Sequence, residues 1–89
     1  MKTNVQNMTS SNGNTIANQF LITTPEGVYF QSYRSIIVFE SNDGITTLDE
    51  HYWNYSKTTA KYRNQFLNET TKETEAKIKS GVYKLANLN

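Results

Sequence analysis

The chain has 89 residues, of which 36% are hydrophobic, so it can bury one small core and has no room for a second domain. Its formal net charge of +1 gives no strong overall attraction to nucleic acid, to anionic membranes or to basic partners. The absence of cysteine excludes a disulfide framework, a thiolate nucleophile and a cysteine-based zinc site.

The first segment of the chain, residues 1–15, consists mainly of Asn, Thr, Ser, Gln and Gly. Ordering such a segment costs conformational entropy that little hydrophobic burial can offset. We therefore expect a flexible N-terminal arm over residues 1–15 and a single α+β domain over residues 16–89. Neither a signal-peptide core nor a stretch of roughly 20 apolar residues is found, so we expect a soluble protein without membrane contact.

The first half of the domain is expected to form an antiparallel β-meander of three to four strands. Thr24-Pro25-Glu26-Gly27 predicts a turn, because Pro presets its second position and Gly suits its fourth. Asn42-Asp43-Gly44 predicts a hairpin, since Asp-Gly tolerates the positive φ that such a turn needs. The predicted strands lie at residues 20–22, 28–33, 35–40 and 45–48, of which 35–40 is the best candidate for a central strand.

The second half has the period of helices, and two short ones are expected to pack on the sheet. Ser56 is suited to cap the first helix, which should end near Asn68. Thr70 and Glu73 form a capping box for the second helix, and Gly81 is suited to end it in a left-handed conformation. The residues expected to face the core are Thr59, Tyr62, Phe66 and Leu67 in the first helix, and Ala76 and Ile78 in the second.

Two further segments complete the expected domain. Trp53 should plug the junction between sheet and helices, and Phe30 should lie in the core. Residues 82–85 could form a final edge strand or lie across the core.

Catalytic and metal chemistry find little support in the residues. His51 stands beside Asp49 and Glu50, but consecutive positions rarely converge on one ion, and the chain has no second histidine. Hydroxyl side chains are plentiful, yet no positioned base can be identified for them. We therefore expect a solvated turn at His51, no metal, no cofactor and no enzymatic activity.

Charge is unevenly distributed along the chain. Residues 1–56 carry two basic and five acidic side chains, whereas residues 57–89 carry seven basic and three acidic ones. Lys57, Lys61, Asn64 and Asn68 fall along one polar stripe of the first helix, and cations with amides on one face could contact phosphates and base edges. Two helices joined by a tight turn are also typical of a helix-turn-helix. The candidate nucleic-acid-binding residues are Lys57, Lys61, Arg63 and Asn64; a merely solvated helix face is the alternative.

Tyrosines offer a second candidate surface. Tyr29, Tyr33 and Tyr52 could be partly exposed, and exposed aromatic residues mark protein interfaces. The alternative is that they fill the core of a leucine-poor domain.

Several segments of the chain resemble a family of small uncharacterised proteins encoded by tailed bacteriophages. The likeness covers Gln19 to Leu88 and leaves out the arm. It is carried by FQSYRSII (30–37), TLD (47–49), WNYS (53–56), KYRNQFL (61–67) and SGVYKL (80–85). The motifs carry no assigned chemistry, so the resemblance transfers no functional residue.

The resemblance implies a setting in the cytoplasm of an infected bacterium, where small phage proteins often act by stoichiometric binding. Our preferred hypothesis is a non-enzymatic accessory protein that binds a host or phage protein and modulates or inhibits it, in host takeover or against host defence. The alternative is a small nucleic-acid-binding protein that uses the basic C-terminal helices. A homodimer is compatible with either, because a thin core and an exposed edge strand favour association.

Overall fold

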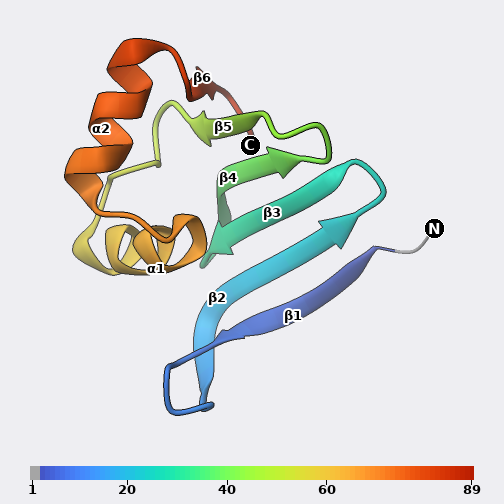
Figure 1. The fold of residues 1–89 in the computed structure, drawn as a ribbon. Helices are drawn as coiled ribbons and strands as arrows, with labels where there is room; N and C mark the ends of the chain where they lie inside the picture. The colour runs from blue at the N-terminus through green and yellow to red at the C-terminus, as the bar shows by residue number, and fades with distance from the viewer. Residues whose placement is uncertain (1–2) are drawn as a thin grey trace.

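The computed structural model describes residues 3–89, which form one six-stranded sheet with two helices gathered at one side of it (Figure 1). The strands are β1 (Asn4–Thr9), β2 (Thr15–Thr24), β3 (Gly27–Ser32), β4 (Ser35–Ser41), β5 (Thr46–Asp49) and β6 (Lys84–Ala86). The helices are α1 (Lys57–Leu67) and α2 (Thr71–Ser80). The expected α+β class is confirmed.

The strands follow one another across the sheet in chain order. The first five form an antiparallel meander, and β6 pairs parallel to β5 after the chain has passed through both helices. The meander expected from the sequence corresponds to β2–β5. The sheet is one strand wider at each edge and mixed rather than purely antiparallel, and residues 84–86 form its final edge strand.

The arm expected over residues 1–15 has to be corrected where the structure describes it. Asn4–Thr9 form β1, with Val5 opposite Ile22 and Asn7 opposite Phe20 of β2. Two gains offset the entropy of ordering these residues: the backbone ladder with β2 and the burial of Met8, which is 3% exposed. The first two residues of the predicted arm lie outside the described part of the chain.

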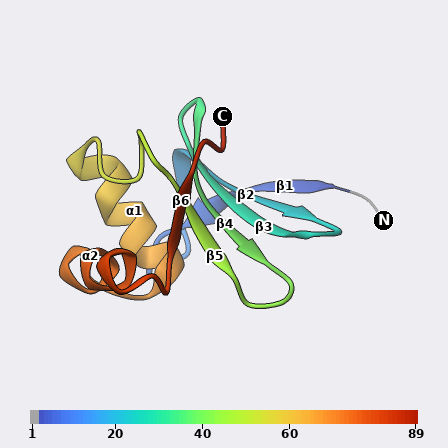
Figure 2. The ribbon, with the colours of Figure 1, turned by 90° about the horizontal axis from the view of Figure 1, so that it is seen from above.

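The core lies between the helices and one face of the sheet, which we call the inner face. Phe30, Val38 and Leu48 are directly opposite one another on neighbouring strands and are fully buried. The Phe30 ring stacks on Phe66 of α1 with 5.7 Å between centroids, as the sequence led us to expect for Phe30. Viewed from above, both helices lie on the same side of the sheet (Figure 2).

Caps and turns agree with the sequence predictions. Ser56 accepts a hydrogen bond from the backbone N–H of Thr59, and Asn68 ends α1 with a φ of 55°. Thr70 and Glu73 form the capping box of α2, and Gly81 ends that helix in the left-handed region. These features were predictable because each depends on residues close together in the sequence.

The inward face of α2 differs from the prediction. Ala76 is exposed, Ile78 is half-buried against the core, and Thr74 is the buried residue of the helix. Thr74 can be buried because its hydroxyl donates to Glu69 Oε2 at 2.5 Å. The inward face of α2 is therefore formed by Thr74 and Ile78, which are four residues apart, and the buried hydroxyl of Thr74 has a partner.

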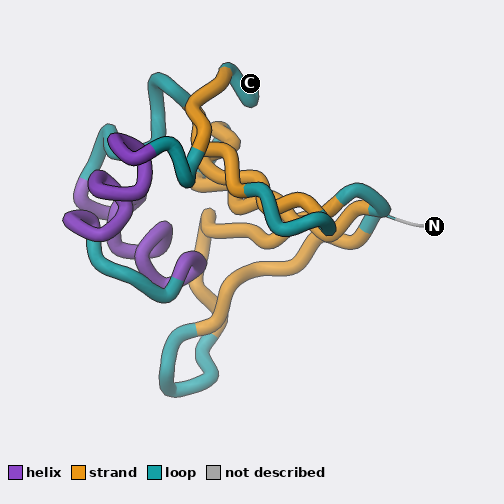
Figure 3. Tube along the Cα trace, turned by 45° about the horizontal axis from the view of Figure 1, so that its top comes forward, coloured by secondary structure: helices purple, strands orange, loops and turns teal. Residues whose placement is uncertain are grey.

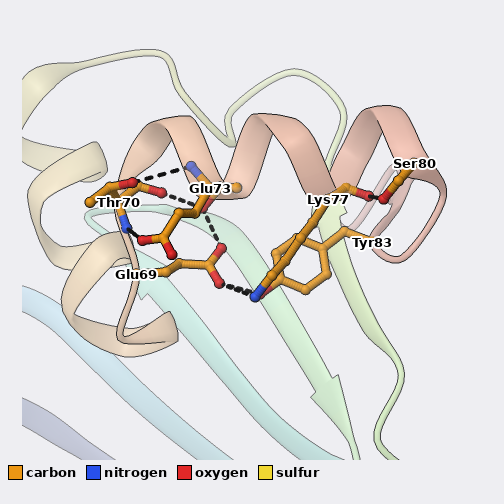
Figure 4. A network of polar contacts seen from close by, with 7 residues as sticks. Glu69, Thr70, Glu73, Lys77, Ser80 and Tyr83 are labelled. Carbon is orange, nitrogen blue, oxygen red and sulfur yellow. Dashed lines mark hydrogen bonds and ion pairs between the residues drawn. The ribbon is translucent and has the colours of Figure 1, made fainter.

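Glu69, in the turn between the helices, fastens α2 and the segment before β6 (Figure 4). Lys77 Nζ and the Tyr83 hydroxyl each donate to its Oε1 at 2.7 Å. Burial favours the neutral acid, but the hydrogen bonds from Lys77, Thr74 and Tyr83 outweigh it and lower the pKa of Glu69 below its usual value. Burial, together with the bond to Glu69, raises the pKa of Tyr83.

Asp49, at the end of β5, fastens the C-terminus. Its carboxylate is buried and accepts from the backbone N–H groups of His51, Tyr52 and Leu88 and from the Asn89 side chain. Burial opposes the charged form, but these donors prevail and lower the pKa of Asp49. The segment after β6 is therefore held against the sheet.

Candidate protein interface

The face of the sheet opposite the helices carries a row of apolar side chains. Because strand residues alternate between faces, Tyr29 points away from the side to which its neighbour Phe30 points. The ladder places one residue from each of four strands in line: Val5, Ile22, Tyr29 and Phe39. We call these four residues the outer-face row.

An aromatic pair lies at the centre of the row. The rings of Tyr29 and Phe39 stack with centroids 4.4 Å apart. Both side chains are half-buried, and neither belongs to the set of side chains that pack on the core. The pair therefore presents aromatic surface on the side of the sheet that the helices leave uncovered.

Gly27 is required beside this pair, because the strands approach closely there. A Cβ at Gly27 would clash with the Glu40 carbonyl oxygen and lie 2.9 Å from the Phe39 ring. A larger residue at this position would therefore collide with β4, and Gly27 also lies at the end of the predicted turn.

The surroundings of the row are largely uncharged at one edge of the sheet. No charged residue occurs between Thr3 and Thr24, which include both β1 and β2. At the opposite edge the line of the row continues through Thr47 of β5 to Lys84 of β6. The row is therefore suited to an apolar surface rather than to a polyanion.

The three tyrosines predicted as a protein-binding set lie in separate places. Tyr29 belongs to the outer-face row. Tyr33 is 48% exposed in the turn between β3 and β4, where its φ is 56°. Tyr52 is 37% exposed in the segment after β5, and its ring meets Tyr55 edge-on at 5.3 Å.

The four residues predicted to bind nucleic acid are not all available on the surface. Lys57 and Lys61 are exposed, but Arg63 is fully buried, so the prediction that Arg63 contacts phosphates is corrected. Its guanidinium donates to the Trp53 carbonyl oxygen at 2.6 Å and to Thr71 Oγ1 at 2.7 Å. Asn64 is engaged in the same cluster, because its Oδ1 accepts from Arg63 at 2.9 Å.

Arg63 instead joins three segments of the chain. It also donates to Asn54 Oδ1 at 3.1 Å and lies over the Trp53 ring, 5.2 Å from its centroid. Burial lowers the pKa of Arg63 from its usual value, while Glu69 and Glu75 act in the opposite direction. Trp53, half-buried against the core, occupies the sheet-to-helix junction as predicted, with Arg63 as its partner.

A hollow of about 440 Å³ lies between α1 and the loop that joins β1 to β2. Its lining residues are Thr9, Ser10, Ser11, Ile16, Lys61, Tyr62 and Gln65. Two of these residues are joined directly, because the Gln65 amide donates to the Thr9 carbonyl oxygen at 2.9 Å. The hollow contains one cation and no acid.

The three neighbouring residues Asp49, Glu50 and His51 do not form a common site. His51 and Glu50 are exposed, while the Asp49 carboxylate is occupied by backbone donors. Within residues 3–89, no three histidine or acidic side chains come together in a way that could hold a metal ion. Within the same residues, no helix has the length and apolar character needed to span a membrane.

Sequence reasoning found Tyr29 but missed the rest of the row. Val5 lay in the supposed arm, and Ile22 and Phe39 belonged to strands whose register was unknown. The alternation within each strand was visible, but a row requires knowing which residues stand opposite one another.

Comparison with known proteins gives one match. The model of a family of unknown function (DUF8033) matches residues 3–81, which include β1 and both helices and end before β6. No curated protein and no solved structure matches the chain.

Proposed function

The chain belongs to the DUF8033 family, and because that family's function is unknown we propose from the geometry of the sheet that the protein binds another protein through the outer-face row. The observation that supports this is the Tyr29–Phe39 pair, stacked on a face that no helix covers. Exposed aromatic residues are enriched where proteins contact one another, because they bury much area at little entropic cost.

The partner proposed for this row is a protein with an apolar, weakly charged docking surface. The uncharged stretch between Thr3 and Thr24 gives a charged partner nothing to pair with at that end of the row. In line with the resemblance to small phage proteins, we propose a host or phage protein in the bacterial cytoplasm, whose activity is modulated by stoichiometric binding.

Nucleic-acid binding, the alternative function, has weaker support. Of its four candidate residues, Arg63 and Asn64 are engaged in the cluster around Trp53. Lys57 and Lys61 remain as exposed cations of α1, and two phosphate contacts give little affinity at physiological salt.

The test is a pull-down of tagged protein from bacterial lysate, with nuclease and at raised salt. We expect a protein retained in stoichiometric amounts under both conditions, since apolar contacts are not screened. The variant Tyr29→Thr/Phe39→Thr should lose it. The control Ile45→Thr/Tyr55→Thr, which removes two exposed side chains elsewhere, should keep it.

Two outcomes would contradict the proposal. One is capture of nucleic acid alone, released by nuclease or salt, which would promote the alternative function. The other is equal retention of the protein by both double variants, which would place the interface away from the row.

A further inference from the structure

The two edges of the sheet differ in how they are protected against pairing with another chain. β6 has three residues, includes Lys84, and is followed by a segment fastened to Asp49 and Ile36. Short length and an edge lysine are devices by which proteins discourage strand addition. β1 has six residues and no charged side chain, and its one irregularity, between Asn7 and Thr9, leaves Asn4–Asn7 regular.

The outward side of β1 offers free backbone groups. Alternate residues of an edge strand point their N–H and C=O groups away from the sheet, where they can pair with another strand. Among the described residues, the Gln65 amide reaches only the far end of β1, at Thr9. Figure 1 shows no other helix or strand of residues 3–89 beside β1 on that side, and the same edge of the sheet is open in Figure 3.

The side chains of β1 suit a partner that is itself uncharged. The sequence of β1 is NVQNMT, and Val5 is 58% exposed although it is apolar. A second copy meets the same uncharged strand, so no like charges oppose the approach. Antiparallel pairing of a strand with itself is symmetric about a two-fold axis, which gives a closed dimer rather than a fibre.

We propose that β1 pairs antiparallel with β1 of a second copy, with the two Val5 residues opposite each other, so that two sheets join into one. This goes beyond the proposed function, because it uses the backbone edge of β1 and needs no other partner. Val5 of each copy then lies on one continuous face, and the two outer-face rows meet end to end. The dimer would hold its two outer-face rows at a fixed distance and orientation, so a partner with two-fold symmetry could bind both rows at once.

Sedimentation equilibrium of the isolated protein, from low micromolar to near millimolar concentration, tests the dimer. We expect a reversible monomer–dimer equilibrium. Val5→Lys, which adds the missing edge charge, should raise the dissociation constant about tenfold or more. Val82→Lys, at an apolar residue that is 63% exposed, is the matched control and should leave it unchanged.

The cysteine-free chain allows a second test, which locates the contact. Under mild oxidation Val5→Cys should form a covalent dimer much faster than Val82→Cys, since pairing centred on Val5 places the two cysteines directly opposite, where Cα atoms are about 4.5–5.5 Å apart. Circular dichroism confirms that each variant is folded.

A monomer at all concentrations, an unchanged equilibrium in Val5→Lys, or equal crosslinking rates would overturn the pairing. Each result is independent of the pull-down, which uses variants at Tyr29 and Phe39. Failure of the dimer and failure of the proposed function are therefore distinguishable.

Discussion

Tyr29 and Phe30 are neighbours in β3, and both stack on another aromatic ring, yet their surroundings are opposite. Phe30 is fully buried and contacts Phe66 of α1, so its pair joins the two layers of the molecule. Tyr29 is half-buried and contacts Phe39 of the adjacent strand, so its pair lies within one layer. The comparison indicates that the inner face holds the fold together and the outer face is available to a partner.

The largest effect is expected at Phe30. Phe30→Ala should lower the free energy of unfolding by about 3–5 kcal/mol, because it removes a buried ring and leaves a cavity. A domain of this size has little more stability than that, so Phe30→Ala can unfold completely. Phe30→Leu, which leaves a smaller cavity, is the milder variant whose loss can still be measured. Urea denaturation measures both. A loss in Phe30→Ala no greater than that in Tyr29→Thr would contradict the statement that the inner face, and not the outer face, holds the fold together.

A loss nearly as large is expected at Arg63. Arg63→Ala should cost about 3 kcal/mol, since it removes packing against Trp53 and leaves buried acceptors without donors. Lys57→Ala, at an exposed cation of the same helix, should leave the thermal midpoint unchanged. If Arg63→Ala were as stable as the wild type, the guanidinium would be free to serve as a surface cation after all.

At Glu69 the expected loss depends on pH. Glu69→Gln should cost about 1–3 kcal/mol at neutral pH, because charge-assisted hydrogen bonds from Lys77 and Tyr83 are weakened. The pKa of Glu69 is lower in the folded state, so its contribution is present above the pKa of the unfolded chain and is lost as pH falls through the folded value. The difference between wild type and variant should therefore shrink in acid.

Denaturation at several pH values measures this difference, with Glu75→Gln as the control on an exposed position of α2. Glu75→Gln should follow the wild type throughout. A Glu69→Gln difference that stays constant into acid would show that the carboxylate charge is not what fastens the segment before β6.

The smallest loss of stability is expected on the outer face. Tyr29→Thr should cost about 1 kcal/mol, roughly the worth of one aromatic pair, because threonine also suits a strand. Thermal unfolding measures it. A loss comparable with that of Phe30→Ala would mean that the outer face supports the fold as much as the inner face does.

Features that depend on neighbours in sequence could be predicted, and features that depend on pairing between distant segments could not. The capping box at Thr70 and the hairpin at Gly44 each reside in a few adjacent residues. β1 was missed because its polar side chains look disordered until β2 supplies the ladder. Val5 and Met8 were the two apolar residues of β1, too few to indicate a strand by themselves.

The candidate site was predictable to a smaller extent. Arg63 looks like a surface cation, although its spacing of four residues from the inward-facing Thr59 placed it on the buried side of α1. The outer-face row requires the register of four strands, which no single segment reveals. Tyr29 was recovered from composition, whereas Phe39 required the ladder between β3 and β4.

The outer face should be dispensable for folding and necessary for binding, and one paired measurement tests this most directly. The affinity of the captured partner and the free energy of unfolding should be determined on the same preparations of wild type and Tyr29→Thr/Phe39→Thr. We predict a variant that stays folded but loses the partner. A variant that unfolds, or that stays folded and binds as tightly as the wild type, would contradict the account.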